Sequence, residues 1–141
     1  LREQFGHVSA ERVLSGSGLV NLYSAVCTME GVQARALQPS DVTSEAIAGS
    51  DVQCVAAVRF FTGFLGSVAG NLALTLGSLG GVYVGGGIVP RLETSFDASL
   101  FRQAFEKKGR YQELLAGVPV WLITASNPAL IGASQALDTL S

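Results

Sequence analysis

Apolar residues recur at helical spacing over much of the first eighty positions of the chain. Leu19, Leu22, Tyr23 and Val26 would share one face of a helix. A glycine follows soon after this run, as is common just beyond a helix end. The pattern therefore predicts an amphipathic helix over residues 17–29.

A longer helical pattern begins near residue 51. Its apolar stripe consists of Cys54, Val55, Val58, Phe61, Leu65, Val68, Leu72 and Leu76. Ser50 followed three residues later by Gln53 is typical of a capping box at a helix start. Small residues within the pattern, among them Gly66 and Gly70, would let a neighbouring backbone approach closely. We expect this helix to be the central buried one, with a short helix over residues 41–48 before it.

The second half of the chain alternates strand and helix signals. Short apolar runs rich in β-branched and aromatic residues predict largely buried strands at 82–84 and 118–124. Asp97 can cap a helix between them, from residue 98 to 107 or 108. Asn127 followed by proline predicts a last helix over 128–137. This order favours an α/β fold with parallel strands and packed helices.

Residues 60–89 contain no charged side chain, so hydropathy alone would also allow a membrane span. Nine glycines interrupt this stretch, and the pattern changes from helix to strand near Gly80. A buried helix followed by a central strand explains both features. We therefore expect no membrane association, while a membrane-embedded helix pair remains the alternative.

Composition limits the partners and the compartment. The 141 residues, 48% of them hydrophobic, suit one domain with one core. A net charge of −2 without a basic run argues against nucleic-acid binding. Two cysteines and one histidine fit neither a disulfide framework nor a zinc site, and the chain has no signal-peptide pattern. We expect a reduced, cytoplasmic protein, and because the chain opens in mid-helix at Leu1, a piece of a longer polypeptide.

Two places could carry chemistry. Glu11 lies in a segment bounded by glycines, and its carboxylate could accept hydrogen bonds from two neighbouring sugar hydroxyls. The alternative is a surface ion pair with Arg12 or simple exposure to solvent. The glycine run 85–87 follows the first predicted strand, where ligands gather in open α/β sheets. Residue type alone favours a tight turn here, and it favours a helix cap for Asn127 after the second strand.

Nearly the whole chain resembles the carboxyl-terminal part of bacterial ATP-dependent glucokinases, of the hexokinase and actin superfamily. The stretches that carry this resemblance are 6–16, 18–23, 70–74, 80–82, 86–91 and 127–128. The resemblance implies the large-lobe portion of a ribonuclease H-like fold. It also implies that Glu11 binds glucose hydroxyls, and that Gly86, Gly87, Leu130 and Gly132 border the adenosine of ATP.

The same resemblance indicates what the chain lacks. The family's amino-terminal phosphate loop, its catalytic aspartate and its Glu-Gly-Gly-His sugar motif have no counterpart here, so we expect no catalytic residue and no Mg²⁺ ligand in these 141 residues. The implied parent enzyme transfers the γ-phosphoryl group of Mg-ATP to the 6-hydroxyl of glucose. Its implied partners are glucose, ATP, the absent amino-terminal lobe and, as an option, a second copy in a homodimer. The alternative is a non-catalytic sugar-sensing or regulatory domain with the same fold.

Overall fold

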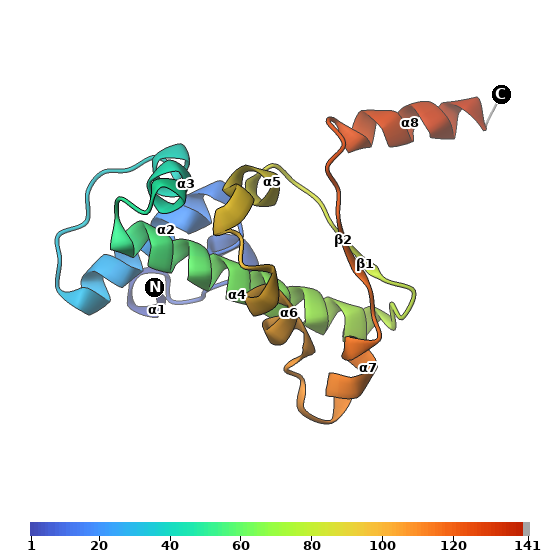
Figure 1. Cartoon of the computed structure of the whole chain (residues 1–141), viewed down its shortest axis with the longest axis horizontal. Coiled ribbons are helices and arrows are strands. Elements are labelled where there is room, and N and C mark those ends of the chain that lie inside the picture. The colour runs from blue at the N-terminus through green and yellow to red at the C-terminus, as the bar shows by residue number, and fades with distance from the viewer. Residues whose placement is uncertain (140–141) are drawn as a thin grey trace.

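The computed structural model describes residues 1–139, apart from the side chain of Asp138, and shows eight helices and two short strands in these residues (Figure 1). The helices are α1 (Arg2–Phe5), α2 (Gly16–Glu30), α3 (Pro39–Ala48), α4 (Val52–Leu76), α5 (Ile88–Leu92), α6 (Ala98–Glu106), α7 (Gln112–Ala116) and α8 (Pro128–Asp138). The strands are β1 (Val82–Val84) and β2 (Val120–Leu122), and 3₁₀ turns lie at Ala10–Arg12, Glu93–Ser95 and Gly109–Tyr111. The short elements α5 and α7 were not predicted from the sequence.

The two strands pair in parallel, as predicted, with Val82 opposite Val120 and Val84 opposite Leu122. Strand β1 has the predicted bounds, whereas β2 is shorter than the predicted 118–124. Both strands are more exposed than expected, because within the described chain each is an edge of a two-stranded sheet. Tyr83 is 68% exposed, and Trp121, which stacks on it with ring centroids 4.8 Å apart, is 43% exposed. The molecule is therefore a mostly helical α/β domain with a small parallel sheet.

Helix α4 is the centre of the packing. It contacts α6 most extensively, then α2 and α3. Gly66 and Gly70 permit the approach of α6, because a Cβ atom at these positions would lie 2.2 Å from the Phe101 carbonyl oxygen and 2.3 Å from that of Phe105. The small residues therefore act as the sequence predicts, by letting the two backbones come together.

Two hydrophobic clusters share this helix. The first joins α2, α3 and the amino-terminal half of α4 through residues that include Tyr23, Val42 and Phe61. The second joins the other half of α4 to α6 and to the chain around β2, through residues that include Phe105 and Val118. Leu65 packs against both clusters.

The buried stripe predicted for α4 is wrong at its end. Leu72 is 53% exposed and Leu76 is 73% exposed, because no described element covers that face of the helix. Phe60 and Phe64, outside the predicted stripe, are also partly exposed. By length and composition α4 could cross a membrane, yet nine of its residues are buried against the rest of the chain.

The helix starts differ in detail from the prediction. Asp51, rather than Ser50, caps α4 by accepting a 2.8 Å hydrogen bond from the Cys54 amide. Gln53 does not reach back to the helix start, since its amide donates to Glu30. The carboxylate stands one residue later, where it meets the free amides of the first turn, so the predicted Ser50–Gln53 capping box is wrong.

Two other caps also depart from the expected pattern. Helix α3 begins at Pro39, two residues earlier than predicted, because Gln38 and Asp41 form a capping box around it. Asn127 precedes α8 as predicted, with proline at the first helical position, but its φ of 54° is left-handed and its side chain makes no capping hydrogen bond. In contrast, Asp97 caps α6 as predicted, through the Leu100 amide.

Candidate functional site

Glu11 lies on the 3₁₀ turn Ala10–Arg12, which α2 holds in place. Ser15, the residue that caps α2, accepts a hydrogen bond from the Gly18 amide and donates one of 2.8 Å to the Glu11 carbonyl oxygen. Asn21, one turn further along α2, donates to the Arg12 carbonyl oxygen at 3.0 Å. Two successive carbonyl oxygens, those of Glu11 and Arg12, are thus bonded to the start of α2.

Glycine at position 18 makes this arrangement possible. A Cβ atom there would lie 2.6 Å from the Val13 carbonyl carbon and 2.7 Å from its oxygen, so any larger residue would push the turn away from α2. The sequence resemblance included Gly18, but its spacing alone did not indicate this close contact.

Glu11 is exposed and lines an open cavity of about 370 Å³, together with Ser9, Arg12 and Ser17. Within residues 1–139 no ion pair joins Glu11 to Arg12. The Arg12 guanidinium instead lies over the Phe5 ring, 4.5 Å from its centre. An exposed carboxylate beside serine hydroxyls offers acceptors and donors suited to a polyhydroxylated ligand.

The glycine run lies at the carboxyl end of β1, as expected. Gly86 has a φ of 114°, a conformation that favours glycine, and Gly87 precedes the first residue of α5. Added Cβ atoms at these two positions would meet nothing closer than the Arg91 side chain, at 3.9 Å from Gly87. The turn therefore presents uncovered backbone, although the left-handed geometry at Gly86 also satisfies the tight-turn alternative.

Leu130 and Gly132 lie on α8, which follows β2 and extends away from the rest of the chain (Figure 1). Leu130 is 71% exposed, and a Cβ atom at Gly132 would meet nothing within 4 Å. The structure thus places the two predicted adenosine segments after the carboxyl ends of paired strands, on separate elements. It does not bring Glu11 together with either of them, because Glu11 belongs to the turn packed on α2.

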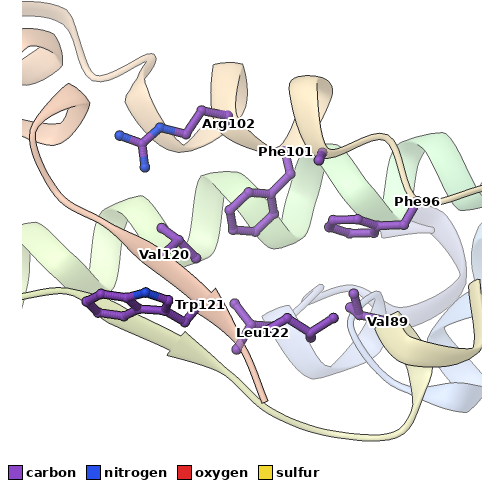
Figure 2. A pocket seen from close by; sticks show the side chains of 9 residues that line it. Val89, Phe96, Phe101, Arg102, Val120, Trp121 and Leu122 are labelled. Atoms are coloured by element: carbon purple, nitrogen blue, oxygen red, sulfur yellow. The ribbon is translucent and has the colours of Figure 1, made fainter. Parts of the chain in front are cut away.

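An apolar cavity that the sequence did not indicate lies between α6 and the strands (Figure 2). Its volume is about 380 Å³, and it is lined by Val84, Val89, Phe96, Ala98, Phe101, Arg102, Val120, Trp121 and Leu122. Figure 2 shows Arg102 extending from α6 toward the chain that leads into β2. The other lining side chains are apolar, so this cavity offers few groups for a polar ligand.

The pKa values of several groups are shifted, but these groups do not lie together as a catalytic site in the described part of the chain. Burial, together with the nearby Asp51 carboxylate, raises the pKa of Cys54 to about 12, so this thiol is inert. Burial also lowers the pKa of Lys108, whose ammonium donates to the Ser67 hydroxyl. Among the side chains that the structure describes, no three His, Cys, Asp or Glu residues come together as metal ligands.

This geometry defines a class of protein: an α/β domain with a small parallel sheet, a glycine turn after one strand and a carboxylate on a turn held by a helix. Residues 1–140 match the family model described as Glucokinase. The chain belongs to the glucokinase family.

Known relatives agree with this assignment. The chain is 52% identical over 138 residues to a glucokinase of Aromatoleum aromaticum and 52% identical over 134 residues to one of Chromobacterium violaceum. These matches cover 98% and 95% of the chain, but 42% and 38% of the relatives. A crystal structure of a glucokinase from an Antarctic psychrotroph superposes with a TM-score of 0.90 at 39% identity, over 98% of this chain and 43% of that one. The chain thus spans about two-fifths of the length of the relatives it matches.

Proposed function

We propose that this chain is the carboxyl-terminal domain of an ATP-dependent glucokinase, whose complete polypeptide transfers the γ-phosphoryl group of ATP to the 6-hydroxyl of glucose. The observation that carries the proposal is the family match, which runs from residue 1 to residue 140. It favours a kinase over the non-catalytic sugar-sensing alternative. We propose also that an amino-terminal lobe of the same polypeptide completes the enzyme, that the enzyme is cytoplasmic, and that a second copy can pair with it as a homodimer.

Within this enzyme Glu11 binds glucose. A carboxylate accepts two hydrogen bonds from neighbouring hydroxyls, and such charge-assisted bonds are stronger than neutral ones. The hydrogen bonds from α2 to the Glu11 and Arg12 carbonyl oxygens support this role, because they limit the motion of the turn before the sugar arrives.

The adenosine of ATP lies, in this proposal, between the Gly86–Gly87 turn and the start of α8 at Leu130 and Gly132. Uncovered glycine backbone lets a nucleotide approach closely. Exposed apolar side chains such as Leu130, at 71% exposure, can cover a base or a neighbouring lobe. We place these segments in a ribonuclease H-like large lobe, in which ligands lie beyond the carboxyl ends of parallel strands.

Phosphoryl transfer depends on positioned phosphates, charge stabilisation and a group that orients the nucleophile. This chain contributes sugar and adenosine contacts, and we assign the base and the phosphate loop to the amino-terminal lobe. The described residues hold no cluster of metal ligands, and we assign the Mg²⁺ ligands to the amino-terminal lobe as well.

The test is coupled turnover with glucose and Mg-ATP. We expect phosphorylation by the complete polypeptide and none by the 141-residue chain alone. Mixing the chain with a separately produced amino-terminal lobe should restore some turnover, which controls for misfolding of the chain. Clear turnover by the verified chain alone would contradict our placement of the catalytic groups.

A further inference from the structure

We propose that Arg102 is a positioning residue for ATP binding: from α6 it holds β2 in register against β1, and so sets the spacing of the two segments assigned to adenosine. This inference rests on the proposed function. Arg102 itself lies at the opposite end of β2 from those segments and acts on them through the strand.

The guanidinium of Arg102 bonds the chain that enters β2. One terminal nitrogen, Nη1, donates to the Val118 carbonyl oxygen at 2.7 Å. The other, Nη2, donates to the carbonyl oxygens of Leu115 at 2.9 Å and Ala116 at 2.7 Å. Three acceptors within four residues of chain are therefore tied to one side chain of α6.

The guanidinium is itself held in place. Its Nε donates to the Glu106 carboxylate, one helical turn further along α6, and its carbon lies 5.1 Å from the centre of the Phe105 ring. With its charge paired and its plane set, the side chain presents its remaining N–H groups as a fixed fork. A lysine at this position would offer one flexible ammonium group in place of that fork.

The backbone ladder that sets the register of β2 is short, and Arg102 adds to the burial of Val118 and the stacking of Trp121 on Tyr83. The strands are three residues long, and the bonds that flank them are Val82 N–H to the Pro119 oxygen and Ile123 N–H to the Val84 oxygen, each 2.9 Å. Pro119 has no N–H group to donate. Arg102 therefore adds three charge-assisted bonds at the point where the chain enters a short strand.

Sliding would change the proposed adenosine site directly. The carboxyl end of β1 leads to Gly86 and Gly87, and that of β2 leads to Leu130 and Gly132 on α8. A shift by one residue would displace the α8 segment by about 3.3 Å relative to the glycine turn. Glu11, on its separate turn, would not move with β2. The inference therefore predicts a defect in ATP binding that spares glucose binding.

The experiment uses Arg102→Met and Arg102→Lys in the complete polypeptide, with KM for ATP, KM for glucose and melting temperature measured for each. We expect Arg102→Met to raise KM for ATP roughly tenfold, the scale of losing a hydrogen bond to a charged group, with KM for glucose changed less than about twofold. Arg102→Lys should also raise KM for ATP more than KM for glucose, but by a smaller factor.

The control is Arg35→Met, which removes an arginine bonded to Glu45 and Asp51, away from the strands. This variant should lower the melting temperature without raising KM for ATP more than KM for glucose. If both KM values rise equally in the Arg102 variants, or if folded Arg102→Lys keeps the wild-type KM for ATP, the positioning role is wrong. Should Arg102→Met fail to fold, Arg102→Lys decides.

Hydrogen exchange separates this inference from the proposed function. The amides of Val82 and Ile123 donate across the strand pair, so they should exchange faster in Arg102→Lys than in wild type. Their exchange rates should be the same in Arg35→Met as in wild type. A wild-type polypeptide without glucose phosphorylation would overturn the proposed function, while faster exchange would still support the hold on β2. Unchanged exchange would overturn that hold whatever the activity.

Discussion

At the scale of single residues, Glu11 combines a free side chain with a restrained backbone. Its side chain lines an open cavity, while the carbonyl oxygens of residues 11 and 12 accept hydrogen bonds from Ser15 and Asn21. We predict that Glu11→Gln in the complete polypeptide weakens glucose binding by about 1.5–3 kcal/mol, the usual scale for hydrogen bonds to a charged group. Isothermal titration calorimetry with glucose, and separately with ATP, measures the effect.

Arg12→Gln is the matched control for this prediction. Its guanidinium lies over the Phe5 ring and forms no ion pair with Glu11 in the described chain. Arg12 lines the same cavity, but its guanidinium is held over the Phe5 ring, so glucose affinity should fall less in this variant than in Glu11→Gln. Equal losses in both variants, or no loss in Glu11→Gln, would mean that Glu11 is an ordinary surface residue.

The sequence motif singles out Glu11 as a candidate, but no sequence pattern points to Arg102. The signal for Glu11 is local, since the glycines and the carboxylate lie within one short stretch. The partners of Arg102 are backbone carbonyl oxygens 13 to 16 residues away, and any residue type provides a carbonyl. No residue pattern could reveal such a contact without the packing of α6 against the entry to β2.

At the scale of elements, the contact of α4 with α6 depends on glycine. We predict that Gly66→Ala lowers stability by about 1–3 kcal/mol, the usual cost of overpacking a close contact. The added Cβ would lie 2.2 Å from the Phe101 carbonyl oxygen, and a backbone atom cannot move aside as a side-chain end can. Thermal unfolding of the complete polypeptide measures the change.

Gly63→Ala is the control within the same helix. A Cβ atom at Gly63 would meet nothing within 4 Å, and alanine favours a helix interior over glycine by about 1 kcal/mol. This variant should melt at the same temperature as wild type or higher. A destabilised Gly63→Ala variant, or an unaffected Gly66→Ala variant, would contradict the close packing.

The ends of helices could be predicted from the sequence where a single residue caps or terminates the helix. Asp97 and the glycine at position 31 mark helix ends in the structure as they do in the sequence. The prediction failed where two residues compete, as Ser50 and Asp51 do at the start of α4. It failed also at Leu72, because periodicity identifies an apolar face but not whether a neighbouring element covers it.

At the scale of the whole molecule, Arg35 links three segments. Its guanidinium pairs with Glu45 at 3.0 Å and Asp51 at 2.6 Å, and its amide donates to the Tyr23 hydroxyl. The pKa of Glu45 is lowered chiefly by the bond from Arg35. Burial opposes the shift at Asp51, but the Cys54 amide and Arg35 lower its pKa overall.

These shifts predict acid sensitivity. A carboxylate whose folded-state pKa is depressed stabilises the fold above its unfolded pKa, and that stability is lost as pH falls through the folded value. The ordinary values are 4.5 for Glu45 and 3.8 for Asp51. We predict that the melting temperature falls between about pH 5 and about pH 3, and that Arg35→Met shows a smaller fall.

Arg59→Met is the control for this pH series. Arg59 is exposed and forms no ion pair within residues 1–139, so its removal should leave the pH profile parallel to that of wild type. If the Arg35→Met profile is also parallel to that of wild type, Arg35 does not stabilise the carboxylates. Differential scanning calorimetry across the pH range distinguishes the two results.

The sequence indicated the parallel α/β arrangement, because strands separated by a helix return in the same direction. It did not indicate how much of the surface is left exposed. Residues 124–137 are exposed throughout, and so are Phe60, Phe64, Leu72 and Leu76 on α4. Burial depends on neighbouring elements, and the chain spans about two-fifths of the length of its relatives.

The sharing of α4 by both hydrophobic clusters has a thermodynamic consequence. The helix is about 37 Å long, and its first half packs in the cluster beneath the Glu11 turn while its second half packs beside the strands. Neither cluster can melt without removing support from the helix that the other needs. Heat should therefore unfold the two clusters in one cooperative transition, with no separate melting of either half of α4.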